Sequence, residues 1–221
     1  MKILAVTDLH YHKPWFSWVA DQAKTGSFGA VMVAGDGLGY LNSPADQENG
    51  LRTWLERFPV PIFWSRGGYD PSSAKLAAIK NPNFHAGGVW VLGSWRIVVV
   101  DVWCDNAIPE TLAQTVVVSH FPPAGTMCAR AAGASFDAAE LGRGDVRTMI
   151  NRISDVRVAI CGSVHEPAGH HDAIGNTLVI NTGMAHNEHS GIPSHAVIDL
   201  DRRHAAISTG RVSTCVDFSR E

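Results

Sequence analysis

Short, uninterrupted apolar runs rich in valine and isoleucine recur from one end of this chain to the other. Runs of this length without polar alternation are typical of strands that are buried on both faces. They therefore predict a protein built largely of strands packed inside a core. The predicted strands are Ile3–Val6, Ala30–Ala34, Val60–Trp64, Val89–Leu92, Ile97–Val102, Val116–Val118, Val156–Cys161, Leu178–Ile180, Ala196–Leu200 and Ala205–Ser208.

Between several of these runs lie segments whose apolar residues recur at helical spacing. The predicted helices are Pro14–Lys24, Asp46–Phe58, Ser73–Ile79 and Asp137–Ile153. Asp137 suits the N-cap position of the last helix, whereas Gly142 and Gly144 mark places where that helix is most easily interrupted.

The order of these elements predicts the fold class. Strands and helices alternate in the first half, which indicates strand–helix–strand units that feed a parallel sheet. The second half is poorer in predicted helix, which indicates antiparallel additions. No repeat or linker divides the 221 residues, and a hydrophobic content of 45% supports a sizeable core. We therefore predict one α/β domain over residues 1–221, with 211–221 either a final strand or a surface tail.

Charge and cysteine usage restrict the partners and the compartment. The net charge is −3 and no run of lysine and arginine occurs, so the sequence gives no electrostatic reason to expect DNA or RNA. No apolar stretch reaches about 18 residues and no signal-peptide pattern is evident, which predicts no association with a membrane. The four cysteines are too far apart for a zinc or redox motif, and unpaired thiols fit a reducing compartment, so we predict a cytoplasmic protein. They are Cys104, Cys128, Cys161 and Cys215.

Residues suited to metal chemistry follow directly after five of the predicted strands. The segments are Asp8-Leu9-His10, Gly35-Asp36-Gly37, Gly67-Gly68-Tyr69-Asp70, Ser119-His120 and Gly162-Ser163-Val164-His165. Ligand sites of α/β folds form in the loops at the carboxyl ends of the strands. Because side chains alternate along a strand, Asp8 and His10 are expected to point the same way from an extended segment. Gly35 is expected to let the backbone at Asp36 approach an ion.

Each segment alone has a plainer interpretation. An Asp-x-His pair arises often by chance, Gly-Asp is usually a turn, and a histidine after a strand is often buried and hydrogen-bonded. The occurrence of all five segments in order, each at a strand end, favours a site for divalent cations. Two cations about 3.5–4 Å apart are the usual device for hydrolysing a phosphoester, and the two oxygens of Asp36 suit a bridge between them.

In this order the segments resemble the motifs of the calcineurin-like metallophosphoesterase family, over roughly residues 1–200. The resemblance implies a four-layer αββα sandwich, in which two mixed sheets pack together with helices outside. It also implies hydrolysis of a phosphomonoester or phosphodiester, such as a nucleotide, by a metal-activated water. The cofactor implied is Mn, Fe, Zn or Mg, with one or two ions per chain and manganese as the first choice to test.

The resemblance assigns the first metal site to residues that are all present. These ligands are Asp8, His10, Asp36 and His165. The second site would share Asp36 and use His120, but Gly68 and Ser163 stand where the family has an asparagine and a histidine. Tyr69 occupies the place of the histidine that acts near the leaving group. Asp70, which supports that histidine in relatives, is retained, so the implied catalytic residues are Tyr69, Asp70 and His120.

These departures leave three outcomes open. The enzyme works with one cation, other residues hold the second cation, or the chain is an inactive member of the fold that acts as a binding or scaffold module. The candidate substitute ligands are His12, His170, His171, Asp172, His186, Asn187 and His189. Residues 170–172 and 186–189 are equally well read as solvated polar loops. Tyr69 either donates a proton or only packs, and Arg66 either binds phosphate or is an exposed loop residue. The oligomeric state is not fixed by the sequence.

Overall fold

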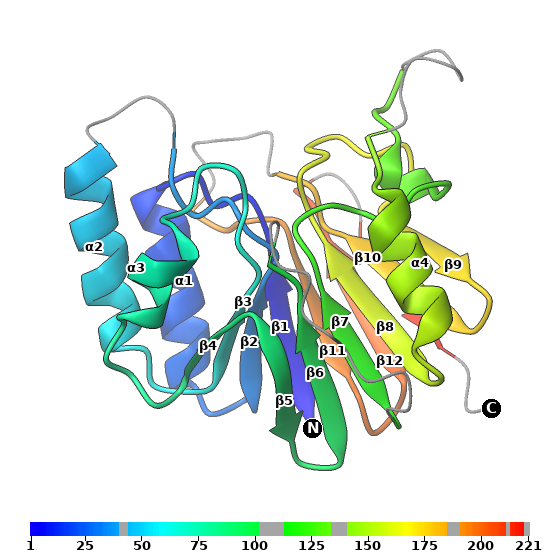
Figure 1. Ribbon diagram of the computed structural model, residues 1–221, viewed down its shortest axis with the longest axis horizontal. Coiled ribbons are helices and arrows are strands. Elements are labelled where there is room, and N and C mark those ends of the chain that lie inside the picture. The colour runs from blue at the N-terminus through cyan, green and yellow to red at the C-terminus, as the bar shows by residue number, and fades with distance from the viewer. Residues whose placement is uncertain (40–43, 102–112, 134–140, 185–190, 211–212, 219–221) are drawn as a thin grey trace.

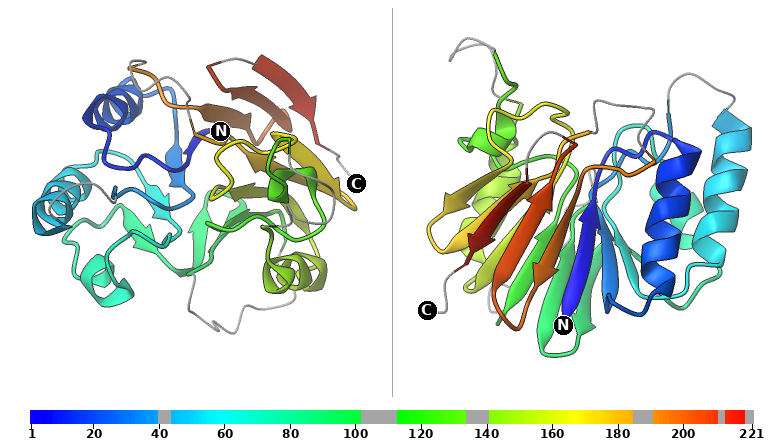
Figure 2. Two further views of the ribbon diagram at one scale, coloured as in Figure 1. Left: turned by 90° about the horizontal axis from the view of Figure 1, so that it is seen from above. Right: turned by 180° about the vertical axis from the view of Figure 1, so that it is seen from behind.

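The structure is a computed structural model that describes residues 1–39, 44–101, 113–133, 141–184, 191–210 and 213–218. Two sheets pack face to face, and helices lie on the outer face of each (Figures 1 and 2). The predicted fold class, two mixed sheets with helices outside, is confirmed.

The first sheet has seven strands in the order β13-β12-β11-β1-β2-β3-β4. Its members are β1 (Lys2–Val6), β2 (Ala30–Val33), β3 (Ile62–Trp64), β4 (Phe84–Ala86), β11 (His195–Asp199), β12 (His204–Ser208) and β13 (Ser213–Asp217). Strands β1 to β4 run parallel, and β11 to β13 are joined antiparallel at the side of β1. The strand-rich end of the sequence therefore supplies the antiparallel half of this sheet.

The second sheet has six strands in the order β5-β6-β7-β8-β10-β9. Its members are β5 (Gly88–Leu92), β6 (Trp95–Val99), β7 (Thr115–Val118), β8 (Val156–Cys161), β9 (His171–Ile174) and β10 (Thr177–Asn181). Strands β6, β7, β8 and β10 run parallel. At the two edges of the sheet, β5 pairs antiparallel with β6 and β9 pairs antiparallel with β10.

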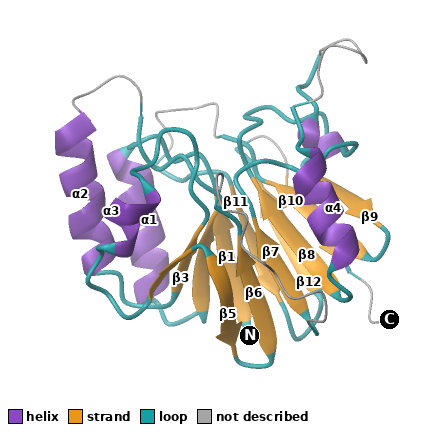
Figure 3. Cartoon of the chain, in the orientation of Figure 1, coloured by secondary structure: helices purple, strands orange, loops and turns teal. Residues whose placement is uncertain are grey.

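The helices divide between the two outer faces (Figure 3). The α-helices are α1 (Lys13–Lys24), α2 (Pro44–Glu56), α3 (Ser73–Ala77) and α4 (Gly144–Arg152), and η1 (Met127–Ala129) is a 3₁₀ turn. Helices α1 to α3 pack on the first sheet, with Trp15 and Leu55 buried against Leu4 and Ile62 of the strands. Helix α4 and η1 cover the second sheet. Among the described residues, no helix combines the length and the hydropathy that a bilayer crossing requires.

The apolar runs of the strands form the core between the sheets. Ile3, Met32 and Phe63 of the first sheet pack with Ile97 and Ile160 of the second, and all of them are at most 1% exposed. Strands in the middle of such a sandwich are buried on both faces, which is why the sequence shows continuous apolar runs instead of alternation.

One predicted helix starts later in the structure, and two strands appear that were not predicted. Helix α4 begins at Gly144, because Arg143 has an extended backbone, and Asp137 lies outside the described residues. The sequence analysis did not predict β4 and β9, whose short, partly polar sequences lack an apolar run. The C-terminal segment forms strand β13, one of its two predicted states. Three cysteines in the described part are free, and they are Cys128, Cys161 and Cys215.

Candidate metal centre

The parallel strands bring the predicted metal residues to one edge of the sandwich. Asp8 and His10 follow β1, Asp36 follows β2, and His120 and His165 follow β7 and β8. The backbone N–H groups of Asp8 and His10 donate to the carbonyls of Gly35 and Asp36, each at 3.0 Å. The loops after β1 and β2 are thus tied together by their own main chains.

The loop after β1 is a left-handed turn and not a continued strand. The φ angles of Asp8 and His10 are 50° and 42°, a region that residues other than glycine rarely adopt. Asp8 and His10 do converge as predicted, but the extended backbone on which that prediction rested is wrong. Asp36 and Ser163 also have positive φ, at 51° and 65°. Such strained backbone gathers at functional sites, where surrounding contacts hold it in place.

Asp8 is fully buried and has one oxygen without a hydrogen-bond partner. Its Oδ2 accepts from the Thr7 hydroxyl at 2.6 Å and from the Ser163 N–H at 3.1 Å. Its Oδ1 has no hydrogen-bond donor but lies 3.5 Å from Nε2 of His165 and 3.9 Å from Nε2 of His10. A buried carboxylate oxygen without a donor is costly, and a bound cation removes that cost.

The two imidazoles complete a donor set around this oxygen. The Nε2 atoms of His10 and His165 lie 3.1 Å apart. Ligands held 2.0–2.2 Å from a tetrahedral ion are about 3.3–3.6 Å from one another, so these three atoms have the spacing of ligands of one cation. Interaction with the Asp8 carboxylate raises the pKa of the His165 imidazole, and burial opposes this. One carboxylate oxygen and two imidazole nitrogens fit a transition-metal ion or zinc.

Asp36 and His120 form a second buried pair beside this donor set. Nε2 of His120 lies 3.3 Å from Oδ2 of Asp36, and its Nδ1 lies 2.8 Å from the carbonyl oxygen of Ala34. Burial by itself would lower the pKa of His120, but the hydrogen bond and charge of Asp36 outweigh it and raise that pKa to about 9. Burial acts to raise the pKa of Asp36, and the hydrogen bond and charge of His120 reverse this, so the pKa is lowered.

The glycine before Asp36 makes room for a histidine. Gly35 has a φ of 86°, and a Cβ added there would lie 2.5 Å from Nδ1 of His120. Gly35 is therefore required by the close approach of the His120 ring, a reason that the sequence did not indicate.

The donor atoms fall into two groups that share one residue. One group contains Asp8, His10 and His165, the other contains Asp8, Asp36 and His120, and within each group the atoms lie within 4.8 Å of one another. The structure thus brings together all the metal ligands that the sequence analysis named. The carboxylate common to both groups is Asp8, whereas the sequence analysis gave the shared position to Asp36.

The loop after β3 lacks side chains that could complete the second group. Gly67 is pressed against Asp36, because a Cβ there would lie 2.1 Å from Oδ1 of Asp36. Gly68 is exposed, and a Cβ there would meet no atom within 4 Å. Tyr69 donates its backbone N–H to Asp36 at 2.9 Å, and its half-exposed ring lies 5.8 Å from the ring of His10.

Asp70 holds the loops after β2 and β3 through hydrogen bonds to both of its oxygens, whereas one oxygen of Asp8 has no donor. Its Oδ2 accepts from the backbone of Asp36 at 3.0 Å, the backbone of Gly67 at 2.9 Å and Nε1 of Trp64 at 2.9 Å. Its Oδ1 accepts from Gly37 at 2.7 Å. Burial raises the pKa of Asp70 despite these donors. Asp70, predicted to be catalytic, thus has its oxygens occupied by the backbone around Asp36 and by Trp64.

The structure contradicts two further interpretations of the sequence, at Arg66 and at residues 170–172. Arg66 is largely buried, and its Nε lies 3.0 Å from Oδ1 of Asp101, so the interpretation as an exposed loop arginine is wrong. His171 and Asp172 belong to β9, and Asp172 accepts the Met127 N–H at 2.7 Å, so this segment is not a solvated loop.

The other substitute ligands do not join the donor groups that the described residues form. His170 contacts the Asn181 carbonyl at 3.2 Å, and the ring of His12 packs against Trp15 at 4.4 Å. His186, Asn187 and His189 lie outside the described residues. Neither Thr7 nor Trp64 is recognisable in the sequence as part of the site. Only the contact of Thr7 with Asp8 and that of Trp64 with Asp70 reveal them.

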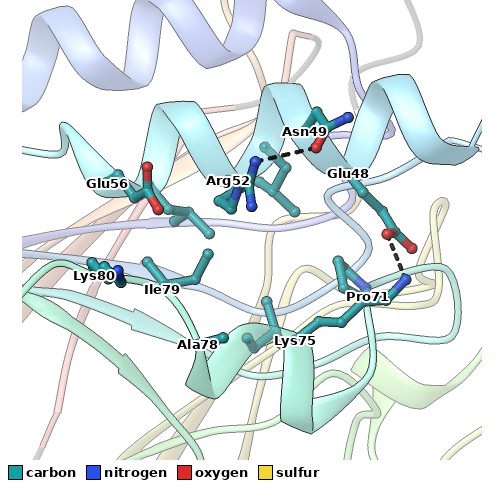
Figure 4. A pocket seen from close by; sticks show the side chains of 12 residues that line it. Glu48, Asn49, Arg52, Glu56, Pro71, Lys75, Ala78, Ile79 and Lys80 are labelled. Atoms are coloured by element: carbon teal, nitrogen blue, oxygen red, sulfur yellow. Dashed lines mark hydrogen bonds and ion pairs between the residues drawn. The ribbon is translucent and has the colours of Figure 1, made fainter.

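A separate pocket of about 530 Å³ lies between α2 and α3 (Figure 4). Its floor includes Leu51, Leu55 and Leu76, and an ion pair of 2.6 Å between Lys75 and Glu48 crosses its rim. None of the metal-donor residues lines it, so the chemistry of the site lies at the strand ends and not here.

Comparison with known structures identifies the class of fold. A dimetal phosphatase from Danio rerio matches with a TM-score of 0.64 and 11% identity over 99% of each chain. An archaeal phosphodiesterase matches with a TM-score of 0.56 and 16% identity, over 98% of this chain and 100% of that one. The phosphoesterase Yfce from E. coli matches with a TM-score of 0.52 and 15% identity, over 99% and 100%.

These identities are low, so the likeness establishes the fold alone. The chain has the fold of the metallophosphoesterases over nearly its whole length. No protein-family model and no curated protein matches the sequence.

Proposed function

We propose that the protein is a metal-dependent phosphoesterase that hydrolyses a small phosphomonoester or phosphodiester, such as a nucleotide. The observation that carries the proposal is the buried, donor-free oxygen of Asp8 with the imidazoles of His10 and His165 converging on it. The fold shared with solved phosphoesterases supports the same reaction class.

The proposed ligands of the cation are Asp8, His10 and His165, with Asp36 of the neighbouring donor group as the fourth, and the mixed oxygen and nitrogen donors suit Mn²⁺, Fe²⁺ or Zn²⁺ better than Mg²⁺. A divalent cation at this position supplies a Lewis acid that lowers the pKa of water and offsets phosphate charge. Because Gly68 and Ser163 offer no ligating side chain of the expected kind, we propose one tightly bound cation per chain, with Mn²⁺ as the first metal to test.

The remaining residues act on the phosphate ester itself. His120 is held through Nδ1 by Ala34 and faces Asp36 with Nε2, so it would donate to a phosphate oxygen by exchanging its hydrogen bond with Asp36 for one with the substrate. The half-exposed phenol of Tyr69 beside His10 is placed to donate a proton to the leaving oxygen. Asp70 keeps the Asp36 loop in place through its hydrogen bonds.

A second candidate function is a binding or scaffold module with no turnover. It is favoured by the open space at Gly68 and by the replacement of two expected imidazoles by Tyr69 and Ser163. Both candidates are consistent with a cytoplasmic protein, a prediction that rests on the sequence.

The test combines metal content with turnover. The purified chain is loaded with Mn²⁺, its ions per chain are counted by elemental analysis, and hydrolysis of bis-p-nitrophenyl phosphate, p-nitrophenyl phosphate and a nucleotide panel is measured. We expect one ion per chain and turnover that Asp8→Asn and His10→Ala abolish. His204→Ala is the matched control, because this partly exposed imidazole pairs with Asp217 away from the centre. Metal binding without turnover on any substrate would favour the scaffold function instead.

A further inference from the structure

The buried hydroxyl of Thr7 lies where the elements of the metal centre meet. Thr7 is 2% exposed, and its Oγ1 lies 2.6 Å from Oδ2 of Asp8 and 3.1 Å from the carbonyl oxygen of Ala34. The same carbonyl accepts from Nδ1 of His120 at 2.8 Å. A Cβ on Gly162 would lie 1.7 Å from this hydroxyl, so the loop after β8 also packs directly against it.

The hydroxyl has one proton for two possible acceptors. The contact with Asp8 is the shorter one, and hydrogen bonds to a carboxylate are stronger than those to a neutral carbonyl, so the proton goes to Asp8. Together with the N–H of Ser163, it gives Oδ2 two donors and leaves Oδ1 with none. The two oxygens of one carboxylate are therefore chemically different before any cation binds.

We propose that Thr7 is a positioning residue that makes Asp8 a ligand through Oδ1 alone. The inference rests on the proposed cation site and adds a residue to it that contacts neither cation nor substrate. Without the hydroxyl, the carboxylate keeps only the Ser163 donor and is free to rotate, which moves Oδ1 away from Nε2 of His10 and His165. The Thr7 hydroxyl also lies beside the Ala34 carbonyl, which orients His120. It therefore adjoins both donor groups, through Asp8 and through this carbonyl.

A purely structural role predicts a different outcome from a positioning role. If Thr7 only fills space, an isosteric Thr7→Val variant loses stability but binds the cation as before. If Thr7 orients Asp8, the same variant loses affinity for the cation even when it is fully folded. Removal of an outer partner of a metal ligand typically costs 10- to 100-fold in affinity.

The experiment measures Mn²⁺ affinity by titration calorimetry and by the electron paramagnetic resonance of free Mn²⁺, on full-length protein stripped of metal. The variants are Thr7→Val, Thr7→Ser, which restores the hydroxyl, and Thr7→Ala as a second test should the valine variant not fold. The control is Thr177→Val, which removes an equally buried hydroxyl that donates to the Val156 carbonyl at 2.7 Å, far along β10 from the site.

We expect affinity to fall about 10- to 100-fold in Thr7→Val and Thr7→Ala, and to stay within about threefold in Thr7→Ser and Thr177→Val. Unchanged affinity in folded Thr7→Val, or an equal fall in Thr7→Ser, would overturn the inference. Wild-type protein that binds Mn²⁺ without turnover, with Thr7→Val weakened, supports the inference and refutes the hydrolase. Turnover in the wild type with equal Mn²⁺ affinity in Thr7→Val supports the hydrolase and refutes the role of Thr7. Wild-type protein that binds no divalent cation refutes the hydrolase and the role of Thr7 together.

Discussion

Restoring the missing ligands tests whether the second cation site has been lost at Gly68 and Ser163. The double variant Gly68→Asn/Ser163→His places an amide and an imidazole at the two departures from the family pattern. Asp36 and His120 already lie 3.3 Å apart next to them, so two of the four ligands of the second site are in position.

The structure indicates that these substitutions cost little stability. A Cβ at Gly68 meets no atom within 4 Å, and replacing glycine in a compatible conformation stabilises a protein by about 0.4–1 kcal/mol through the unfolded state. Ser163 already has a φ of 65°, a region in which histidine is found more often than most residues. The hydrogen bond from Ser163 to Asp8 uses the backbone N–H and survives the change of side chain.

The gain in affinity is the larger effect. If each added ligand contributes about 1.5–3 kcal/mol, as contacts with charged groups do, the second cation binds roughly 10²- to 10⁴-fold more tightly. Elemental analysis after dialysis against Mn²⁺ is expected to rise from about one ion per chain to about two.

Matched controls separate ligation from general effects of the substitutions. Gly144→Asn changes another glycine with free space around its Cβ, and Arg203→His places histidine at a φ of 55° in a remote turn. Neither control is expected to change the metal content. A folded double variant that still binds a single ion would show that this space is not the second site and would refute the reasoning.

Three further predictions concern single residues. Tyr69→Phe is expected to lower kcat about 10²-fold with little change in KM, since proton donation is lost and packing is kept; unchanged kcat in steady-state assays would assign Tyr69 a packing role. Asp70→Asn is expected to destabilise the protein by about 3–5 kcal/mol in urea unfolding, because an amide cannot accept from all four donors that Asp70 serves; a loss below about 1 kcal/mol would contradict its positioning role. The folded pKa of His120, about 9, lies above its unfolded value, so this residue stabilises metal-free protein fully below about pH 6.5, and the effect is lost as the pH rises through 9. Urea unfolding of EDTA-treated protein is expected to show a loss of up to about 3 kcal/mol between these values, and an equal loss in His120→Gln would refute the assignment.

The sequence predicts the sheets well because the strand signal is local. Runs such as Ile97–Val99 or Val116–Val118 are buried on both faces, and continuous apolar residues report this directly. Strand β9 lies at an edge of the second sheet, where polar residues such as His171 and Asp172 are accommodated. Its sequence therefore lacks the apolar run that marks a buried strand. Within residues 141–143 the backbone at Arg143 is extended, so α4 starts at Gly144, later than the residue spacing predicts.

The metal residues could be named from the sequence, but the way in which they converge could not. The left-handed turn at Asp8 and His10 depends on hydrogen bonds to the carbonyls of Gly35 and Asp36, from a loop more than 20 residues away in the chain. The role of Gly35 depends likewise on the ring of His120. Contacts between distant segments decide both features, and no local pattern encodes them.

The buried carboxylates of Asp70 and Asp8 differ in their hydrogen bonding, and this difference indicates a structural role for Asp70 and a functional role for Asp8. Asp70 accepts four hydrogen bonds that involve both of its oxygens, whereas Asp8 has an oxygen with no hydrogen-bond donor. Asp8 lies beside His165 instead, and the interaction raises the pKa of that imidazole. Replacing Asp8 alone by an apolar residue leaves the Thr7 hydroxyl and the Ser163 N–H without their acceptor, and loss of one partner of a buried charged group is destabilising. Asp8→Leu is therefore expected to lower the free energy of unfolding under both candidate functions, but only the enzyme also loses its cation and its turnover, whereas the folded scaffold keeps its partner.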